Sequence, residues 1–305
     1  MKKIKLNKSK VSKNYILLND ALEDFYKNCI IKNLSDKSLV YYREVIGYLL
    51  KYDTKMYVHE YSNEVIEDYI CYMKKRDLKD TTINIRLRGV KVFFNFCYDK
   101  GYIDTPIKVK AIKETETIKE PYTLEEIDIL LQKPDMNKFH DYRNWVIINF
   151  LLATGCRAST LLNIRKKDID FNKDTITFIH TKNRKQQIIP LAKSLKPILV
   201  EYFEILEDDI QENDYAFPSQ WGTQMKLITL QQGISRYNKA RGVDKTSIHL
   251  FRHTFGDNCA KNGMNAFKIQ ALLGHTTLKM TNRYIHMQSE TLKEDIDNTC
   301  ILNNR

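Results

Sequence analysis

Two short segments in the second half of the chain combine basic side chains with turn or helix signals. The segment HLFRHTF places His249 and Arg252 three residues apart, and therefore on one face of a helix, with His253 one turn from His249. In TGCR, an apolar run stops at Gly155, and Arg157 lies in the turn before the next apolar run. Both segments therefore offer hydrogen-bond donors.

Two further segments add a lysine, a histidine and a tyrosine. Lys182 precedes a basic turn between DTITFIH and QQIIPL, two β-rich runs that predict a hairpin. In LLGHTTLKMTNRY, Gly274 is expected to end one helix, which leaves His275 in a turn, and Tyr284 follows nine residues later on the next predicted helix.

The shared property of these residues is that they donate hydrogen bonds, which suits a phosphate group with growing negative charge. The sequence shows no Walker-type loop, no clustered carboxylates for Mg²⁺ and no glycine-rich dinucleotide turn. Phosphoryl transfer without a metal needs a protein nucleophile and a protein acid, and the phenol of Tyr284 can serve as the nucleophile. Taken singly, each segment also fits an ordinary role: a capping arginine, a solvated hairpin lysine, a packing tyrosine.

The His249–His253 pair raises a metal-binding alternative, because histidines four apart on a helix can share a zinc ion. Arg252 lies between them and the intervening residues include no glutamate. A cation between two ligands disfavours a dication, so no metal site is predicted, and a hydrogen-bonded structural histidine is the better interpretation of His253.

Four helical patterns precede these segments and predict a compact helical domain. They cover residues 17–30, 35–52, 62–78 and 80–101; Ser62 is expected to cap the third, and Gly101 to close the fourth. Their polar faces carry five candidate DNA-contact residues: Lys37, Arg43, Arg86, Arg88 and Lys91.

A second domain is expected after a charged, proline-containing stretch without helical periodicity. Thr123 and Glu126 form a capping-box pattern before an apolar run and mark its first helix. The predicted boundaries are a basic tail over 1–13, a helical domain over 14–104, a linker over 105–119, a catalytic domain over 120–287 and a C-terminal tail over 288–305.

Composition indicates the kind of partner and the cellular compartment of the protein. The formal net charge of +11 and a pI near 9.1 favour a polyanionic partner, with nucleic acid ahead of a membrane surface. Six scattered cysteines without a CxxC pair predict reduced thiols in the cytoplasm. Apolar runs are too short to span a bilayer, and the basic N-terminus lacks the apolar stretch of a secretory signal.

In order and spacing together, the four segments resemble the tyrosine recombinases, the phage-integrase and Xer-type family. The similarity covers nearly the whole chain and is specific over roughly its last 185 residues. It implies a mainly α-helical fold with a small β-hairpin or sheet, in which a SAM-like core-binding domain and a catalytic domain form a clamp around double-stranded DNA. The implied catalytic residues are Arg157, Lys182, His249, Arg252, His275 and Tyr284.

The resemblance also implies the reaction and its partners. Both arginines and His275 would bind the scissile phosphate, Tyr284 would attack it with His249 steering the proton, and Lys182 would protonate the leaving 5′ oxygen. The expected activity is site-specific recombination through a 3′-phosphotyrosyl intermediate, serving DNA integration, excision or resolution, without a cofactor. A homotetramer linked through the C-terminal tail, with accessory DNA-bending or directionality proteins, is implied as well.

Two positions depart from the family pattern, and three other functions compete. Thr160 stands where a glutamate is usual, and Leu250 where an aspartate is common, so the bracing of Arg157 is left open. The alternatives are a type IB topoisomerase-like enzyme without strand exchange, a catalytically silent DNA-binding protein and, more distantly, a metal-dependent hydrolase.

Overall fold

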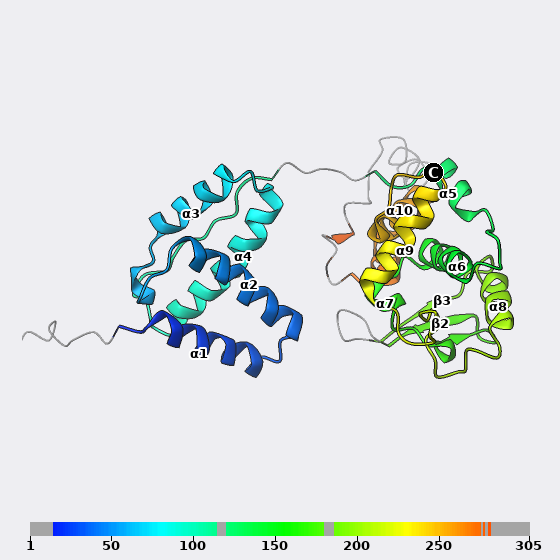
Figure 1. Cartoon of the computed structure of the whole chain (residues 1–305), viewed down its shortest axis with the longest axis horizontal. Helices are drawn as coiled ribbons and strands as arrows, with labels where there is room; N and C mark the ends of the chain where they lie inside the picture. Colours follow the sequence, from blue (N-terminus) through cyan, green and yellow to red (C-terminus); the bar gives the residue numbers. More distant parts are fainter. Residues whose placement is uncertain (1–14, 115–119, 180–185, 276, 278–279, 282–305) are drawn as a thin grey trace, which may run out of the picture. The chain divides into compact units, whose positions relative to one another are not determined.

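The computed structural model describes residues 15–114, 120–179, 186–275, 277 and 280–281. It divides after Thr117 into two compact units, named here unit 1 (residues 1–117) and unit 2 (residues 118–305). Most of the described elements are helices, and unit 2 adds a small sheet (Figure 1). The predicted mainly α-helical class is confirmed.

Unit 1 contains four α-helices and one short 3₁₀-helix among its described residues. Ser35 and Ser62 cap the second and third helices, accepting from the N–H groups of Ser38 at 3.3 Å and Val65 at 3.4 Å. Gly101 follows the fourth helix with a φ of +72°, the left-handed conformation that ends helices. The elements are α1 (Leu18–Ile31), α2 (Asp36–Tyr52), η2 (Val58–Glu60), α3 (Asn63–Lys75) and α4 (Asp80–Asp99).

The centre of unit 1 is a close crossing of α2 and α4. A Cβ added at Gly89 of α4 would lie only 2.2 Å from Val45 Cγ2 of α2. The glycine therefore allows the two helices to approach, and aromatic rings such as Phe25, Phe93 and Phe94 fill the core around them.

An extended segment follows α4 and packs along unit 1. Ile107 and Val109 are buried, and the Lys108 N–H donates to Asn63 Oδ1 at 2.6 Å. Asn84 bonds both backbone groups of Ile112, donating to its carbonyl at 2.9 Å and accepting from its N–H at 2.8 Å. The predicted linker over 105–119 is thus held by unit 1 as far as Ile112.

Unit 2 is built around α6, most of whose side chains are buried. Helices α5, α8, α9 and α10 all contact α6, which Figure 1 shows in their midst. The Thr123–Glu126 capping box that the sequence predicts is present at the start of α5. The helices are α5 (Leu124–Leu131), α6 (Phe139–Thr154), α7 (Ala158–Leu161), η3 (Lys166–Asp168), α8 (Lys196–Ile205), α9 (Leu227–Ala240), α10 (Ile248–Lys261) and α11 (Ala266–Leu273).

A three-stranded antiparallel sheet flanks these helices, in the order β1 (Ile169–Asp170), β2 (Thr175–Phe178) and β3 (Gln187–Pro190). The predicted hairpin is present, with Phe178 opposite Gln187 at its described end. The sequence did not reveal β1, because two residues are too short to show an alternating pattern.

Within the described part of the chain, no helix combines the length and apolar character required to cross a membrane.

Candidate active site

Arg157 is placed by the glycine that ends α6. Gly155 adopts a φ of +59°, after which the chain becomes extended at Arg157, the N-cap residue of α7. The half-buried Arg157 guanidinium donates through Nη2 to the carbonyl oxygen of Gly274 at 3.3 Å. Burial lowers the pKa of this guanidinium, but an arginine remains charged at neutral pH.

Arg252 occupies the interior of unit 2, where it is only 8% exposed. Its two terminal nitrogens donate to different backbone carbonyls: Nη1 to Gly155 at 2.8 Å and Nη2 to Leu273 at 2.6 Å. A buried charge is tolerated when it is hydrogen-bonded in this way. Arg252 therefore joins the end of α6 to the end of α11.

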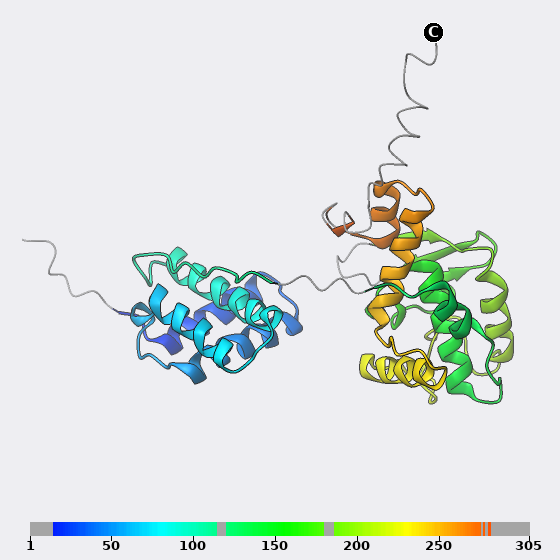
Figure 2. The same cartoon turned by 90° about the horizontal axis from the view of Figure 1, so that it is seen from above.

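The C-terminal end of α11 is the point on which both arginines converge. The last carbonyls of a helix lack partners within the helix and carry partial negative charge, so they suit cationic donors. The Gln187 side chain of β3 binds there too, donating from Nε2 to Ala271 at 2.7 Å and Leu272 at 2.9 Å. Figure 2 shows α11, in orange, beside α10.

Gly274 makes this arrangement possible. It has a φ of +57°, and a Cβ at this position would lie 2.8 Å from Gln187 Oε1. The sequence correctly predicts Gly274 as the end of a helix, but it gives no sign of the side chain that packs against the glycine.

His275 follows Gly274 and is buried, with 7% of its surface exposed. Its ring nitrogen Nδ1 lies 2.9 Å from Thr281 Oγ1. Its backbone N–H donates to Gln270 at 3.0 Å, and the Gln270 amide donates back to the His275 carbonyl at 3.2 Å. Both the turn and the imidazole orientation are thereby fixed.

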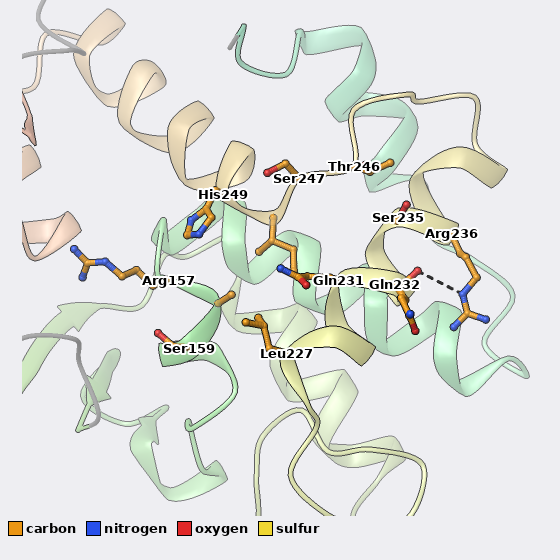
Figure 3. Close-up of a pocket in the computed structure, with 12 residues that line it drawn as sticks. Arg157, Ser159, Leu227, Gln231, Gln232, Ser235, Arg236, Thr246, Ser247 and His249 are labelled. Carbon is orange, nitrogen blue, oxygen red and sulfur yellow. Dashed lines mark hydrogen bonds between the residues drawn. The ribbon is translucent and has the colours of Figure 1, made fainter. Parts of the chain in front are cut away.

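His249 lies near the start of α10 and is exposed. Together with Arg157 it lines a cavity of about 840 Å³ that extends along α9 (Figure 3). Among the residues that the structure describes, no acidic side chain lines this cavity. Basic and uncharged polar side chains in a cavity wall favour an anionic ligand.

The described structure thus brings four of the six predicted residues, Arg157, His249, Arg252 and His275, to the region around α7, α10 and the end of α11. Lys182 and Tyr284 lie outside the described residues. No group of three histidine, cysteine, aspartate or glutamate side chains suited to a metal ion occurs among the residues that the structure covers.

Backbone groups hold Arg157 at both its carbonyl and its guanidinium. Thr160 is buried, and its N–H donates to the Arg157 carbonyl at 2.9 Å. The observed contact of the guanidinium is with the Gly274 backbone. Sequence reasoning missed this acceptor because every residue has a backbone carbonyl. It missed Gln187 and Thr281 because uncharged polar side chains carry no signal of a site.

The five candidate DNA-contact residues of unit 1 come from α2 and α4. All but Arg86 are exposed; Arg86 lies over the Tyr48 ring at 3.8 Å, and Arg43 lies 5.2 Å from the Tyr26 ring centre. The two helices are further joined by Tyr41, whose hydroxyl donates to the Ile85 carbonyl at 2.6 Å. These residues, Lys37, Arg43, Arg86, Arg88 and Lys91, remain predictions as DNA contacts.

A helical unit followed by a second unit with converging arginine and histidine donors fits the class of protein that the sequence resembles, and comparison with known families identifies that class. Residues 122–291 match the phage integrase family, and residues 17–111 match the phage integrase SAM-like domain. The chain belongs to the phage integrase family, which confirms the resemblance seen in the sequence.

Curated relatives include tyrosine recombinases from several bacteria. A XerC from Chlamydia caviae is 25% identical over 247 residues, covering 79% of each chain. A XerD from Listeria innocua is 24% identical over 293 residues, covering 91% of this chain and 97% of the relative.

Solved structures share the fold. The Tn1549 transposon integrase in complex with transposon right end DNA has a TM-score of 0.75 at 19% identity, covering 91% of this chain and 98% of the other. A λ integrase dimer bound to a COC′ core site has a TM-score of 0.74 at 18% identity, covering 90% of this chain and 97% of the other.

Proposed function

We propose that this protein is a site-specific DNA recombinase that cuts and rejoins DNA through a covalent bond between Tyr284 and a 3′ phosphate. Family membership and the tyrosine recombinases among its relatives support the enzyme class. The observation that carries the residue assignment is the convergence of Arg157, Arg252 and His275 at the end of α11.

Arg157 and Arg252 bind the non-bridging oxygens of the scissile phosphate. Each guanidinium has five N–H donors in a planar fork, so an arginine that donates to a backbone carbonyl keeps further donors for phosphate. His275 adds a hydrogen bond to the same group. Because these donors are held in place before DNA binds, they stabilise the negative charge that grows in the transition state.

The covalent step exchanges one phosphate ester for another. The Tyr284 oxygen attacks phosphorus while the bond from phosphorus to the 5′ oxygen breaks. His249 receives or steers the phenol proton, and Lys182 supplies a proton to the leaving oxygen. A 5′ hydroxyl from a partner duplex then reverses the step. The phosphotyrosyl link conserves the ester bond energy, so ATP is not required.

The same proposal includes how the protein assembles on DNA. Unit 1 and unit 2 close around duplex DNA, with the linker along one side, and Lys37, Arg43, Arg86, Arg88 and Lys91 contact the DNA from unit 1. A λ integrase tetramer bound to a Holliday junction has this fold, with a TM-score of 0.73 at 18% identity. By analogy, four copies of this chain form the synaptic complex, with residues 288–305 linking neighbours. The protein acts in the cytoplasm, with accessory DNA-bending or directionality proteins.

The decisive experiment compares the wild-type protein with Tyr284→Phe. Both are incubated with DNA from the native genetic context, and protein–DNA adducts that resist detergent are isolated and sequenced. We expect Tyr284→Phe to bind DNA normally and to form no adduct. An adduct that survived the substitution would exclude Tyr284 as the nucleophile.

Arg157→Ala tests the role of the phosphate-binding donors. Cleavage should fall by about 100-fold or more, as when other transition-state donors are removed, while DNA affinity changes little. Equal losses in both would indicate that Arg157 only positions DNA.

Sedimentation of the DNA complex separates a tetrameric recombinase from a topoisomerase-like enzyme, which needs one copy.

A further inference from the structure

Trp221 lies in water at the tip of a well-constructed turn. It is 80% exposed, although an indole ring is usually at least partly covered. The turn is closed by the Ser219 N–H donating to Thr223 at 2.8 Å and by the Gly222 N–H donating to Ser219 at 3.2 Å. The Ser219 hydroxyl accepts from the Trp221 N–H at 3.1 Å and lies 2.8 Å from the Thr223 hydroxyl. These hydrogen bonds fix the backbone from which the indole extends into solvent.

The base of this turn is fastened to α6. Arg143, a buried residue of α6, donates through Nη1 to the Pro218 carbonyl at 2.6 Å. His140 Nε2 lies 3.0 Å from Gln220 Oε1. Both contacts lie on the segment that precedes Trp221, and they limit the motion of the backbone that carries the indole.

The surroundings of the indole are basic. Trp221 lines a cavity of about 420 Å³ together with His140, Arg143, Lys226 and Arg236, and no acidic side chain lines it within the described part of the chain. Arg236 also lines the cavity of Arg157 and His249, where it extends from α9 (Figure 3). Arg236 lines both cavities, so basic residues extend from the candidate active site along α9 to the cavity beside Trp221.

We propose that Trp221 and Arg236 form a DNA-backbone contact outside the scissile phosphate, where the indole covers a deoxyribose and its N–H donates to a phosphate oxygen. This inference rests on the proposed recombinase function, because it takes duplex DNA as the ligand. An apolar ring with one donor at its edge fits the alternation of sugar and phosphate. The flanking cations and the continuity with the active-site cavity favour DNA over a protein partner.

Tryptophan fluorescence tests the contact directly in the full-length protein. The chain has two tryptophans: Trp221, and Trp145, which is 6% exposed and donates to the Leu131 carbonyl. Titration with a mixed-sequence DNA duplex at low salt should shift the emission to shorter wavelength and protect it from acrylamide. A Trp221→Phe variant, which retains only Trp145, should show neither change.

Affinity measurements complete the test. Trp221→Ala should weaken duplex binding by about tenfold, the loss expected for one hydrogen bond to a charged group. Arg236→Gln should weaken binding and lower its salt dependence. Leu124→Ala is the matched control, since Leu124 is 72% exposed on the same unit; it should bind as the wild type does.

The outcomes separate this inference from the proposed function. A wild-type protein that bound duplex DNA, with Trp221 emission and the affinity of Trp221→Ala both unchanged, would overturn the contact alone. A wild-type protein without any affinity for duplex DNA would overturn both proposals.

Discussion

The two units of this protein differ in what they bury. Among the described residues, unit 1 buries one polar side chain, Asn84, whereas unit 2 buries ten, including Arg143, Arg252 and His275. Burying a polar or charged group costs free energy unless hydrogen bonds replace those to water. At the candidate active site of unit 2, hydrogen bonds to Arg252 and His275 offset this cost.

The comparison shows that the interiors of the two units have different roles. In unit 1 the apolar core creates a stable shape whose basic residues remain at the surface, and Asn84 fastens the segment after α4. In unit 2 the interior itself orients Arg252 and His275. A mutation in the apolar core of unit 1 should therefore act through stability, and one that disturbs the buried donors of unit 2 should act through the chemistry.

The largest effect is expected for Gln187→Leu in unit 2. This change removes the amide that donates to Ala271 and Leu272, so the end of α11 and the turn at His275 lose an anchor. Cleavage under saturating DNA should fall by a factor on the order of 100, because displacements of about 1 Å in an active site have such effects. The measurement is the rate of covalent adduct formation, alongside DNA affinity.

Gln186→Leu is the matched control for this change. Gln186 is the preceding residue, of the same type, and it is exposed. Its adduct rate should equal that of the wild type. If Gln187→Leu lowered DNA affinity as much as the adduct rate, the assignment of Gln187 to active-site geometry would be wrong.

An intermediate effect is expected for Gly89→Ala in unit 1. The new Cβ would clash with Val45 Cγ2, and overpacking of a core typically costs about 1–3 kcal/mol. The free energy of unfolding of unit 1 should fall by roughly this amount, less a helix-propensity gain of about 1 kcal/mol. Chemical denaturation followed by circular dichroism measures the change, and the adduct rate at saturating DNA should stay the same.

Gly47→Ala on α2 provides the contrast. No atom lies within 4 Å of a Cβ added at Gly47, so this alanine should leave stability unchanged or raise it. Equal destabilisation by the two alanines would rule out the close helix crossing as the cause.

The smallest effect is expected from buried tyrosines, which occur in both units. They change the free energy of unfolding only at alkaline pH. Burial raises the pKa of Tyr61 in unit 1, and of Tyr142 and Tyr237 in unit 2, from 10.0 to about 12. A phenol with a higher pKa in the folded chain holds its proton more tightly there. Its contribution to stability is therefore complete below pH 10 and is lost as the pH rises through about 12.

Denaturation at successive pH values tests this expectation. The titration of these groups should not make the free energy of unfolding vary with pH near neutrality, and the free energy should decline between pH 10 and 12. Tyr237→Phe should show a shallower decline than the wild type, and an identical decline would mean that Tyr237 does not contribute.

Much of the fold could be predicted because it depends on local signals. The serine and threonine caps, the left-handed glycines and the alternating residues of β2 each act over a few neighbouring positions. The family pattern likewise indicated Arg157, His249, Arg252 and His275. The two-residue strand β1 gave too little pattern to detect.

What could not be predicted are contacts between distant segments. Arg157 donates to a carbonyl 117 residues later in the chain, and Gln187 to carbonyls 84 and 85 residues later. Every residue except proline has the same backbone groups, so the sequence does not reveal which carbonyl will accept such a bond.

The donors of this site are held by backbone carbonyl oxygens, which a substitution does not remove. The acceptors for Arg157, Arg252 and Gln187 are main-chain oxygens of Gly155 and of residues 271–274. Replacing the side chain of Ala271, Leu272 or Leu273 leaves those oxygens in the polypeptide. The donor geometry therefore depends on the path of α11, and a new side chain at these positions disturbs it only if it displaces the helix, as a change at the buried Leu273 would.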